Sequence, residues 1–362
     1  MSHLTYPEAM VVGLIQGVTE LFPVSSLGHS VLIPALIGGS WAQDLNVSAP
    51  ESPYLAFIVG LHVATALAMI AYFWRDWLRI IGGFFSSLRH RRVETADQRL
   101  AWMIILATIP VGIAGLALEH LFRVAFSKPI PTAVFLSVNG LILLGAERLR
   151  RSRHATGQAA ASQPVGTTAA IPAFGTAGPG LAGGPTAALA SAVPAVVTRP
   201  DQLAVSHASP GRHASGQRAF RQEETAAAVV ADTRLSVMGY LQAVLIGSTQ
   251  ILALLPGISR DGIAMVTGTL RGLSREDAAR FSFLLSAPVI LAAGVLKVPD
   301  LMGHLGHGIR GQVLVGSLLS FIGAYLSVRF LVRYFRQSRP LTPFGIYCLL
   351  AGLGSLLYLT LR

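Results

Sequence analysis

Charge is scarce in this sequence. Only 12% of the 362 residues are charged, whereas 52% are hydrophobic, and lysine occurs at just two positions, Lys128 and Lys297. The mean hydropathy is +0.58. A chain this apolar and this poor in charge is not an ordinary soluble enzyme, so the composition predicts an all-α polytopic membrane protein.

Acidic residues and cysteine are also few. The 17 acidic residues against 28 basic ones leave a formal charge of +11. Because the arginines flank apolar runs and do not form a stripe on a soluble domain, we expect no nucleic-acid partner. The single cysteine, Cys348, excludes an internal disulfide. Residues 1–9 lack the basic start of a secretory signal peptide, so we expect none.

Long apolar runs dominate the chain. Each is long enough, or nearly so, to cross a hydrocarbon core of ~30 Å as a helix. The six runs cover roughly residues 54–73, 100–118, 132–147, 281–299, 312–331 and 343–361. Two more apolar segments, 7–38 and 236–270, are interrupted by "FPVSSLGH" and "LPGISRDG". Their proline and glycine residues predict helices that are broken in the middle.

The placement of arginine predicts the topology. Arginines gather after the first run, after the third, before the fourth, and between the fifth and sixth, whereas the loop after the second run holds only Arg123 and Lys128. If each interrupted segment returns to its own side, all four arginine-rich loops lie on the cytoplasmic side. The sequence therefore predicts six transmembrane helices plus two re-entrant helical hairpins, with both termini extracytoplasmic.

The two halves of the chain resemble one another. Without gaps, "GLIQGVTELFPVSSLG" at 13–28 aligns with "GSTQILALLPGISRDG" at 247–262, and each segment precedes three apolar runs. An odd number of spans per repeat predicts an inverted repeat with a site at the repeat interface. We expect a first repeat at 1–150, a disordered cytoplasmic linker rich in Ala, Gly and Pro at 151–234, and a second repeat at 235–362.

The first interrupted segment contains an acidic residue at membrane depth. Glu20 would be costly there unless it faced a cavity and bound something cationic. Gln16 lies four residues earlier, on the same helical face. A carboxylate supported by an amide suits a hard divalent cation, Mg²⁺ or Ca²⁺, shared with phosphate oxygens. The structural alternative is a glutamate that caps a helix or extends its carboxylate to the membrane–water interface.

The polar residues after Pro23 offer a second kind of chemistry. Ser25 and Ser26 precede a new apolar helix, where serine commonly serves as an N-cap. The same helix N-terminus can bind an anion. His29 lies three residues after Ser26 and is able to face it across one turn, and a serine beside a histidine is a pairing used in nucleophilic and acid–base catalysis.

The second interrupted segment supplies an anion-binding set. Ser259 and Arg260 follow a proline and a glycine at the start of another apolar helix, and Gln250 aligns with Gln16. Arginine is suited to bidentate contact with phosphate. Its neighbour Asp261 could instead neutralise it. Taken together, the two segments favour phosphoryl transfer over other reaction classes.

These motifs resemble those of a known family. "QGVTELFPVSSLGH" and "LPGISRDGIAMVTG" look like the two signature motifs of the undecaprenyl-diphosphate phosphatase, or bacitracin-resistance, family. The resemblance implies a hydrolase in the bacterial plasma membrane that removes the terminal phosphate of a polyprenyl diphosphate lipid, so that the monophosphate carrier is recycled for cell-wall assembly. It also implies roles for the polar residues. Glu20 and Gln16 would serve the metal and the diphosphate, Ser26 and His29 phosphoryl transfer, and Arg260 and Ser259 the phosphates.

The second motif departs from the family pattern. Asp261 and Ala264 stand where the family commonly has serine and threonine, and Thr267 could supply a hydroxyl one turn later. His62 is a further candidate, although a lone intramembrane histidine more often satisfies a structural partner. A transporter or flippase for the lipid carrier, and a catalytically inactive relative, remain alternative functions. A homodimer is compatible with the sequence.

Overall fold

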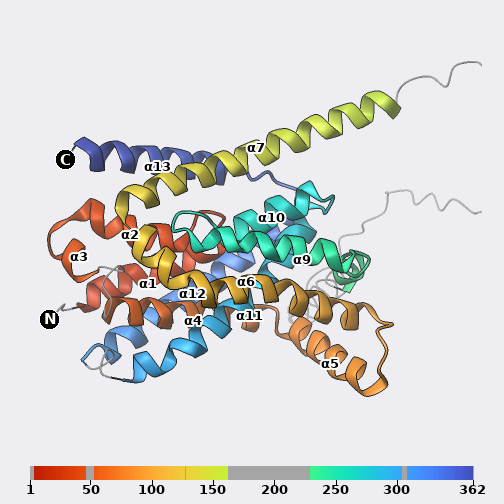
Figure 1. Ribbon diagram of the computed structural model, residues 1–362, viewed down its shortest axis with the longest axis horizontal. Helices are drawn as coiled ribbons and strands as arrows, with labels where there is room; N and C mark the ends of the chain where they lie inside the picture. Colours follow the sequence, from red (N-terminus) through yellow and green to blue (C-terminus); the bar gives the residue numbers. More distant parts are fainter. Residues whose placement is uncertain (1–3, 46–52, 127, 162–228, 304–307, 362) are drawn as a thin grey trace, which may run out of the picture.

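The computed structural model describes residues 4–45, 53–126, 128–161, 229–303 and 308–361. Across these ranges the secondary structure is helical, with no strand (Figure 1). The elements are α1 (Tyr6–Leu21), α2 (Ser26–Ile37), α3 (Gly39–Asp44), α4 (Pro53–Tyr72), α5 (Trp74–His90), α6 (Ala96–Phe126), α7 (Pro129–Ala161), α9 (Tyr240–Thr249), the 3₁₀ helix η1 (Gln250–Leu254), α10 (Arg260–Leu270), α11 (Arg275–Met302), α12 (Arg310–Arg336) and α13 (Thr342–Leu361).

The apolar runs predicted from the sequence all lie in helices. Five helices among the described residues, α6, α7, α11, α12 and α13, are long and apolar enough to cross a membrane. The remaining run forms α4, which meets α5 at an 85° bend, and a second bent pair joins Val229–Ser236 to Tyr240–Leu254 at 102°. The described part of the chain therefore holds five to seven candidate spans, a range that includes the predicted six.

Both interrupted segments are broken where the sequence predicts. Helix α1 ends at Leu21 and α2 begins at Ser26, with Pro23 between them. In the second segment η1 ends at Leu254 and α10 begins at Arg260. Each new helix has a serine N-cap, Ser25 or Ser259, whose hydroxyl accepts a hydrogen bond from a backbone N–H three residues on.

Glycine lets the broken helices pack closely on long helices from the other half of the chain. A Cβ on Gly13 or Gly17 of α1 would collide with the backbone of Gly316 or Ser320 in α12. A Cβ on Gly247 of α9 would collide with the backbone of α6. Small residues at helix crossings of this kind are typical of membrane proteins. Figure 1 shows α7 and α13 running side by side along one edge of the bundle.

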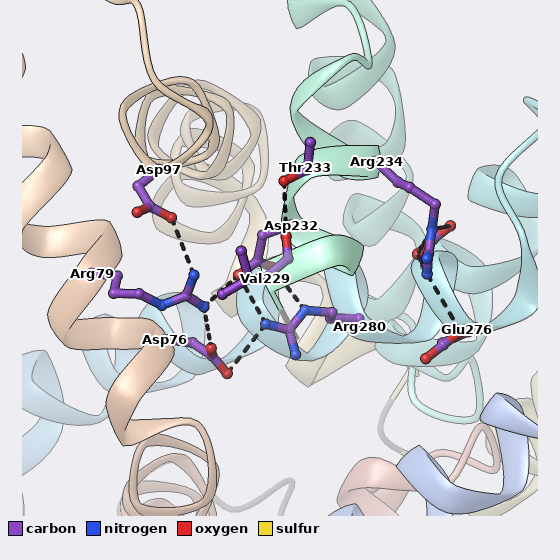
Figure 2. Close-up of polar contacts among 10 residues, drawn as sticks. Asp76, Arg79, Asp97, Val229, Asp232, Thr233, Arg234, Glu276 and Arg280 are labelled. Carbon is purple, nitrogen blue, oxygen red and sulfur yellow. Dashed lines mark hydrogen bonds and ion pairs between the residues drawn. The ribbon is translucent and has the colours of Figure 1, made fainter. Parts of the chain in front are cut away.

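A network of ion pairs ties the start of the second half to both halves of the bundle (Figure 2). Asp232, which is 1% exposed, lies in the helical segment Val229–Ser236. It accepts hydrogen bonds from Arg280 of α11 at 2.8 and 3.0 Å and from Arg79 of α5 at 2.7 Å. Both arginines also reach Asp76, at 2.5 and 3.2 Å. The network therefore fixes α5, α11 and the Val229–Ser236 segment together.

The ends of the predicted linker are more ordered than expected. Helix α7 continues to Ala161, and Val229–Ser236 is helical, so residues 151–161 and 229–234 belong to helices. The sequence did not predict these helical turns, because their side chains are mostly small or charged and form no apolar pattern. Residues 162–228 lie outside the described part of the chain, and the division into two repeats and a linker stays a prediction.

Candidate active site

The two helix breaks meet inside the bundle. Ser25 at the first break accepts a hydrogen bond on Oγ from the backbone N–H of Gly257 at the second break, at 3.2 Å. In the other direction, the Ser259 hydroxyl donates to the carbonyl of Phe22 at 3.5 Å. Ser25 has a positive φ of 68°, a conformation that is uncommon outside glycine and often found at functional sites. Ser25 and Ser259 thus cap and join the breaks.

One side chain from α7 bridges the breaks, and sequence reasoning missed it. Asn139, 1% exposed, donates through Nδ2 to the carbonyl of Pro23 and accepts through Oδ1 from the N–H of Ser259, both at 3.1 Å. The same Nδ2 lies 3.3 Å from Cys348 Sγ. A lone asparagine in an apolar run signals a buried polar contact, but the sequence does not reveal its partners.

Glu20 lies at the centre of the polar cluster. Its Oε2 accepts hydrogen bonds from Gln16 Nε2 at 2.8 Å and from the hydroxyl of Ser26. His62 of α4 places Nε2 3.3 Å from the same oxygen, and its Nδ1 lies 2.9 Å from the carbonyl of Ile58. Both of these partners are oxygen acceptors, and an imidazole N–H can donate a hydrogen bond to either of them. His62 therefore supports Glu20 instead of making an isolated structural contact.

Arg260 completes the cluster from the second break. Its Nη1 lies 3.7 Å from Glu20 Oε1, too far for a hydrogen bond, and within the described residues this nitrogen is buried without a hydrogen-bond partner. Gln16 Oε1 is likewise buried and unpaired among the residues described. One unsatisfied donor and one unsatisfied acceptor beside a carboxylate suit a ligand that carries both anionic oxygens and a cation.

His29 and Ser26, which the sequence analysis considered as a pair, bond to different partners. The Ser26 hydroxyl points to Glu20. His29 Nδ1 lies 2.7 Å from the carbonyl of Ser25, and Nε2 lies 2.7 Å from the hydroxyl of Tyr347 in α13. Across the described hydrogen bonds no Ser26–His29 bond is present. Sequence reasoning also missed Tyr347, because nothing local marks it out among the aromatic residues of α13.

Asp261, one of the altered residues of the second motif, bonds to α11. Asp261 is buried, and its Oδ1 accepts hydrogen bonds from Ser282 at 2.8 Å and Ser286 at 2.5 Å, both in α11. The added carboxylate is therefore held by two hydroxyls. Thr267 donates to the carbonyl of Ile263, one turn earlier, and its hydroxyl oxygen lies 3.3 Å from that of Thr249, so this hydroxyl is used within the second half.

Gln250 does not join the other predicted site residues. It is buried at the start of η1, and in the part of the chain described here both of its side-chain polar atoms lack hydrogen-bond partners. Its alignment with Gln16 predicts a matching role. However, Leu254 stands where Glu20 would have its counterpart, so the second half has no carboxylate for Gln250 to support.

A divalent cation fits this site only together with a ligand. No group of three or more His, Cys, Asp or Glu side chains among the described residues could hold a metal ion. The unpaired Gln16 Oε1 and the Oε1 of Glu20 offer two oxygens, a donor type that Mg²⁺ and Ca²⁺ prefer. Mg²⁺ is commonly held by one or two protein oxygens plus phosphate oxygens of a substrate, so the residues present fit a shared ion.

Comparison with known proteins places the chain in a family. The family model described as Bacitracin resistance protein BacA matches residues 9–174 and 216–354. The chain belongs to this family. A protein of Mycolicibacterium paratuberculosis named undecaprenyl-diphosphatase is 54% identical over 361 residues, covering 100% of this chain and 99% of its own length. Frankia alni has an undecaprenyl-diphosphatase 2 that is 53% identical, covering 97% of each chain.

The family match spans both helix breaks. Its two matched ranges contain Glu20 and Ser26 in the first and Arg260 in the second. More distant members also align along most of the chain. An undecaprenyl-diphosphatase 2 of Burkholderia orbicola is 36% identical over 94% of this chain. The similarity is therefore not confined to the apolar helices.

Proposed function

We propose that this protein is an undecaprenyl-diphosphatase, an integral-membrane hydrolase that converts undecaprenyl diphosphate to the monophosphate carrier and inorganic phosphate. The observation that carries the proposal is the hydrogen bond from Ser26 to Glu20, beside Arg260, where the two helix breaks meet. A nucleophile bonded to a base that other groups orient is the arrangement of covalent catalysis. Relatives that bear this name align along the whole chain at 53–54% identity.

The diphosphate would bind between the two helix N-termini. Helices α2 and α10 begin at Ser26 and Arg260, and helix N-termini favour anions through their free N–H groups and dipole. Arg260, with its unpaired Nη1, would contact phosphate oxygens. Glu20 and Gln16 would hold Mg²⁺ or Ca²⁺ together with the diphosphate. When bound, that cation would neutralise charge that develops on the phosphate oxygens.

The reaction would proceed in two displacements. Ser26 Oγ attacks the terminal phosphorus, its proton passes to Glu20, and the bond from that phosphorus to the bridging oxygen breaks, so that undecaprenyl phosphate leaves. Water then attacks the phosphorus of the phosphoserine and gives its proton to His29 Nε2. Phosphate is released as the bond to Ser26 Oγ breaks, Ser26 Oγ takes back the proton held by Glu20, and His29 then gives its proton to bulk water. Gln16 and His62 keep the Glu20 carboxylate oriented toward Ser26.

The architecture we propose is an inverted repeat of six spans and two re-entrant hairpins in the bacterial plasma membrane. Reciprocal contacts support it. Gly28 and Gly262 occupy aligned positions, and so do Pro23 and Gly257. A Cβ on Gly28 would lie 3.1 Å from Gly257, and a Cβ on Gly262 would lie 3.1 Å from Pro23. Likewise, α1 packs on α12 while α9 packs on α6. Both termini would be extracytoplasmic, opposite the arginine-rich loops.

Phosphate release by the purified protein in detergent tests the function. Undecaprenyl diphosphate is supplied with Mg²⁺ or Ca²⁺, and parallel reactions contain a chelator. We expect cation-dependent release that Ser26→Ala abolishes. A wild-type protein that is folded yet releases no phosphate with either cation would refute the proposal. If the wild type released no phosphate and Ser26→Ala still moved the lipid carrier across the membrane of vesicles, the function would be transport and not hydrolysis.

A further inference from the structure

Tyr347 contacts the candidate active site from the far end of the chain. It lies in α13, 318 residues after His29, and its hydroxyl oxygen is 2.7 Å from His29 Nε2. The two rings are nearly parallel, with an interplanar angle of 3° and centroids 5.8 Å apart. His29 is only 7% exposed, whereas Tyr347 is 47% exposed. The phenol therefore stands at the bundle surface, next to a buried imidazole.

The partners of His29 fix the direction of each hydrogen bond. The carbonyl of Ser25 can only accept, so Nδ1 of His29 carries a proton and donates it. In the neutral ring Nε2 is then an acceptor, and the Tyr347 hydroxyl donates to it. The imidazole is held at both nitrogens, and the lone pair on Nε2 points at Tyr347. Neither Ser26 nor Glu20 contacts this ring among the described hydrogen bonds.

We propose that Tyr347 is a positioning residue of the active site. Its hydroxyl orients the His29 imidazole and shields Nε2 until water attacks. The proposal rests on the proposed function, in which Nε2 accepts a proton from the attacking water. That water must take the place of the Tyr347 hydroxyl at Nε2, so the phenol has to turn aside during each turnover. Its half-exposed position on α13 gives the ring space to do so.

A simple packing role makes a different prediction. If Tyr347 only filled space beside α2, its ring would matter and its hydroxyl would not. Tyr347→Phe removes the hydroxyl and keeps the ring. Tyr358→Phe is a matched control, because Tyr358 lies on the same helix and is 46% exposed.

Chemical labelling measures how accessible His29 Nε2 is to a reagent, and it does not require an active enzyme. Diethyl pyrocarbonate acylates an unprotonated imidazole nitrogen, and peptide mass spectrometry reports the rate at each histidine. In the full-length protein we expect Tyr347→Phe to raise the rate at His29 about threefold to tenfold, the effect of losing one hydrogen bond. Rates at His62 and the exposed His90 report on folding and should stay at wild-type values, as should the His29 rate in Tyr358→Phe.

Kinetics then tests the positioning role. With undecaprenyl diphosphate, Tyr347→Phe should lower kcat about threefold to tenfold, because the imidazole loses one of the two hydrogen bonds that hold its orientation before water replaces the hydroxyl. KM should change less than about twofold, because the hydroxyl does not contact the substrate. An unchanged His29 labelling rate, or an unchanged kcat in an active enzyme, would overturn the proposal. If the wild type released no phosphate, the proposed function would fail, and the labelling result alone would decide whether Tyr347 covers His29.

Discussion

Asn139 gives the sharpest test of the idea that the two helix breaks form one unit. Its side chain bonds both breaks from α7 while 1% exposed. Asn139→Leu keeps a similar size but removes both hydrogen bonds, and leaves the carbonyl of Pro23 and the N–H of Ser259 without their strong partner. Each buried, unsatisfied backbone group costs about 1–3 kcal/mol. The substitution should therefore destabilise the fold by about 2–6 kcal/mol.

For the carbonyl of Pro23 we expect a cost near the lower end of the range of about 1–3 kcal/mol per unsatisfied group. Its carbonyl keeps a weak contact to the thiol of Cys348 at 3.7 Å. The assay is unfolding by sodium dodecyl sulfate in mixed micelles, followed by loss of helical circular dichroism. Phosphate release is measured on the fraction that remains folded. Activity should fall beyond the loss of folded protein, because Ser26 and Arg260 sit at the two breaks that Asn139 holds.

Ser137→Ala is the matched control on the same helix. Ser137 is also buried, but among the described hydrogen bonds its hydroxyl donates only to the carbonyl of Ala133 within α7. Its loss should cost about 1 kcal/mol or less and leave the activity of folded protein unchanged. If Asn139→Leu were as stable and as active as Ser137→Ala, the clamp between the breaks would not matter and the reasoning would be wrong.

Three further substitutions, two of them paired with a control variant, probe other parts of the account. Asp232→Ala should destabilise the protein by about 3–5 kcal/mol in the same unfolding assay, because the buried Arg280 loses its main partner. Glu94→Ala, which breaks an exposed ion pair with Arg92, should cost under about 1 kcal/mol. If both variants lost the same free energy of unfolding, burial would not explain the strength of the Asp232 network. Gly13→Leu should reduce folded yield or cost at least about 1–3 kcal/mol, since α1 cannot approach α12, whereas Gly82→Ala has open space around it and should be tolerated. Asp261→Ser should leave KM for the diphosphate within about twofold, because the carboxylate bonds to Ser282 and Ser286; a tenfold change would show that Asp261 acts on the substrate.

Much of the helical layout could be predicted from the sequence because membrane helices carry strong local signals. Long apolar runs located α6, α7, α11, α12 and α13, and the prolines near residues 23 and 256 located the breaks. The contact of Glu20 with Gln16 follows from four-residue spacing on one helix, and it is confirmed.

Contacts between distant elements could not be predicted in the same way. His62, Asn139 and Tyr347 reach the breaks from α4, α7 and α13, and no spacing rule links them to residues 20–29. Spacing across one turn suggested a Ser26–His29 pair. Instead, Ser26 hydrogen-bonds to Glu20, and His29 hydrogen-bonds to Tyr347. Local spacing shows which residues can share a face, but packing between helices decides which of them bond.

The most direct test of the central claim is phosphate release from undecaprenyl diphosphate by Glu20→Gln, compared with Glu8→Gln. Both glutamates lie on α1 and both are buried, but Glu8 belongs to the capping box at the start of that helix, where glutamine can replace it. We predict that Glu20→Gln loses cation-dependent release about 100-fold or more, as expected for a general base, while Glu8→Gln retains it. Equal activity of the two folded variants would contradict the assignment of Glu20 and move the catalytic centre away from the helix breaks.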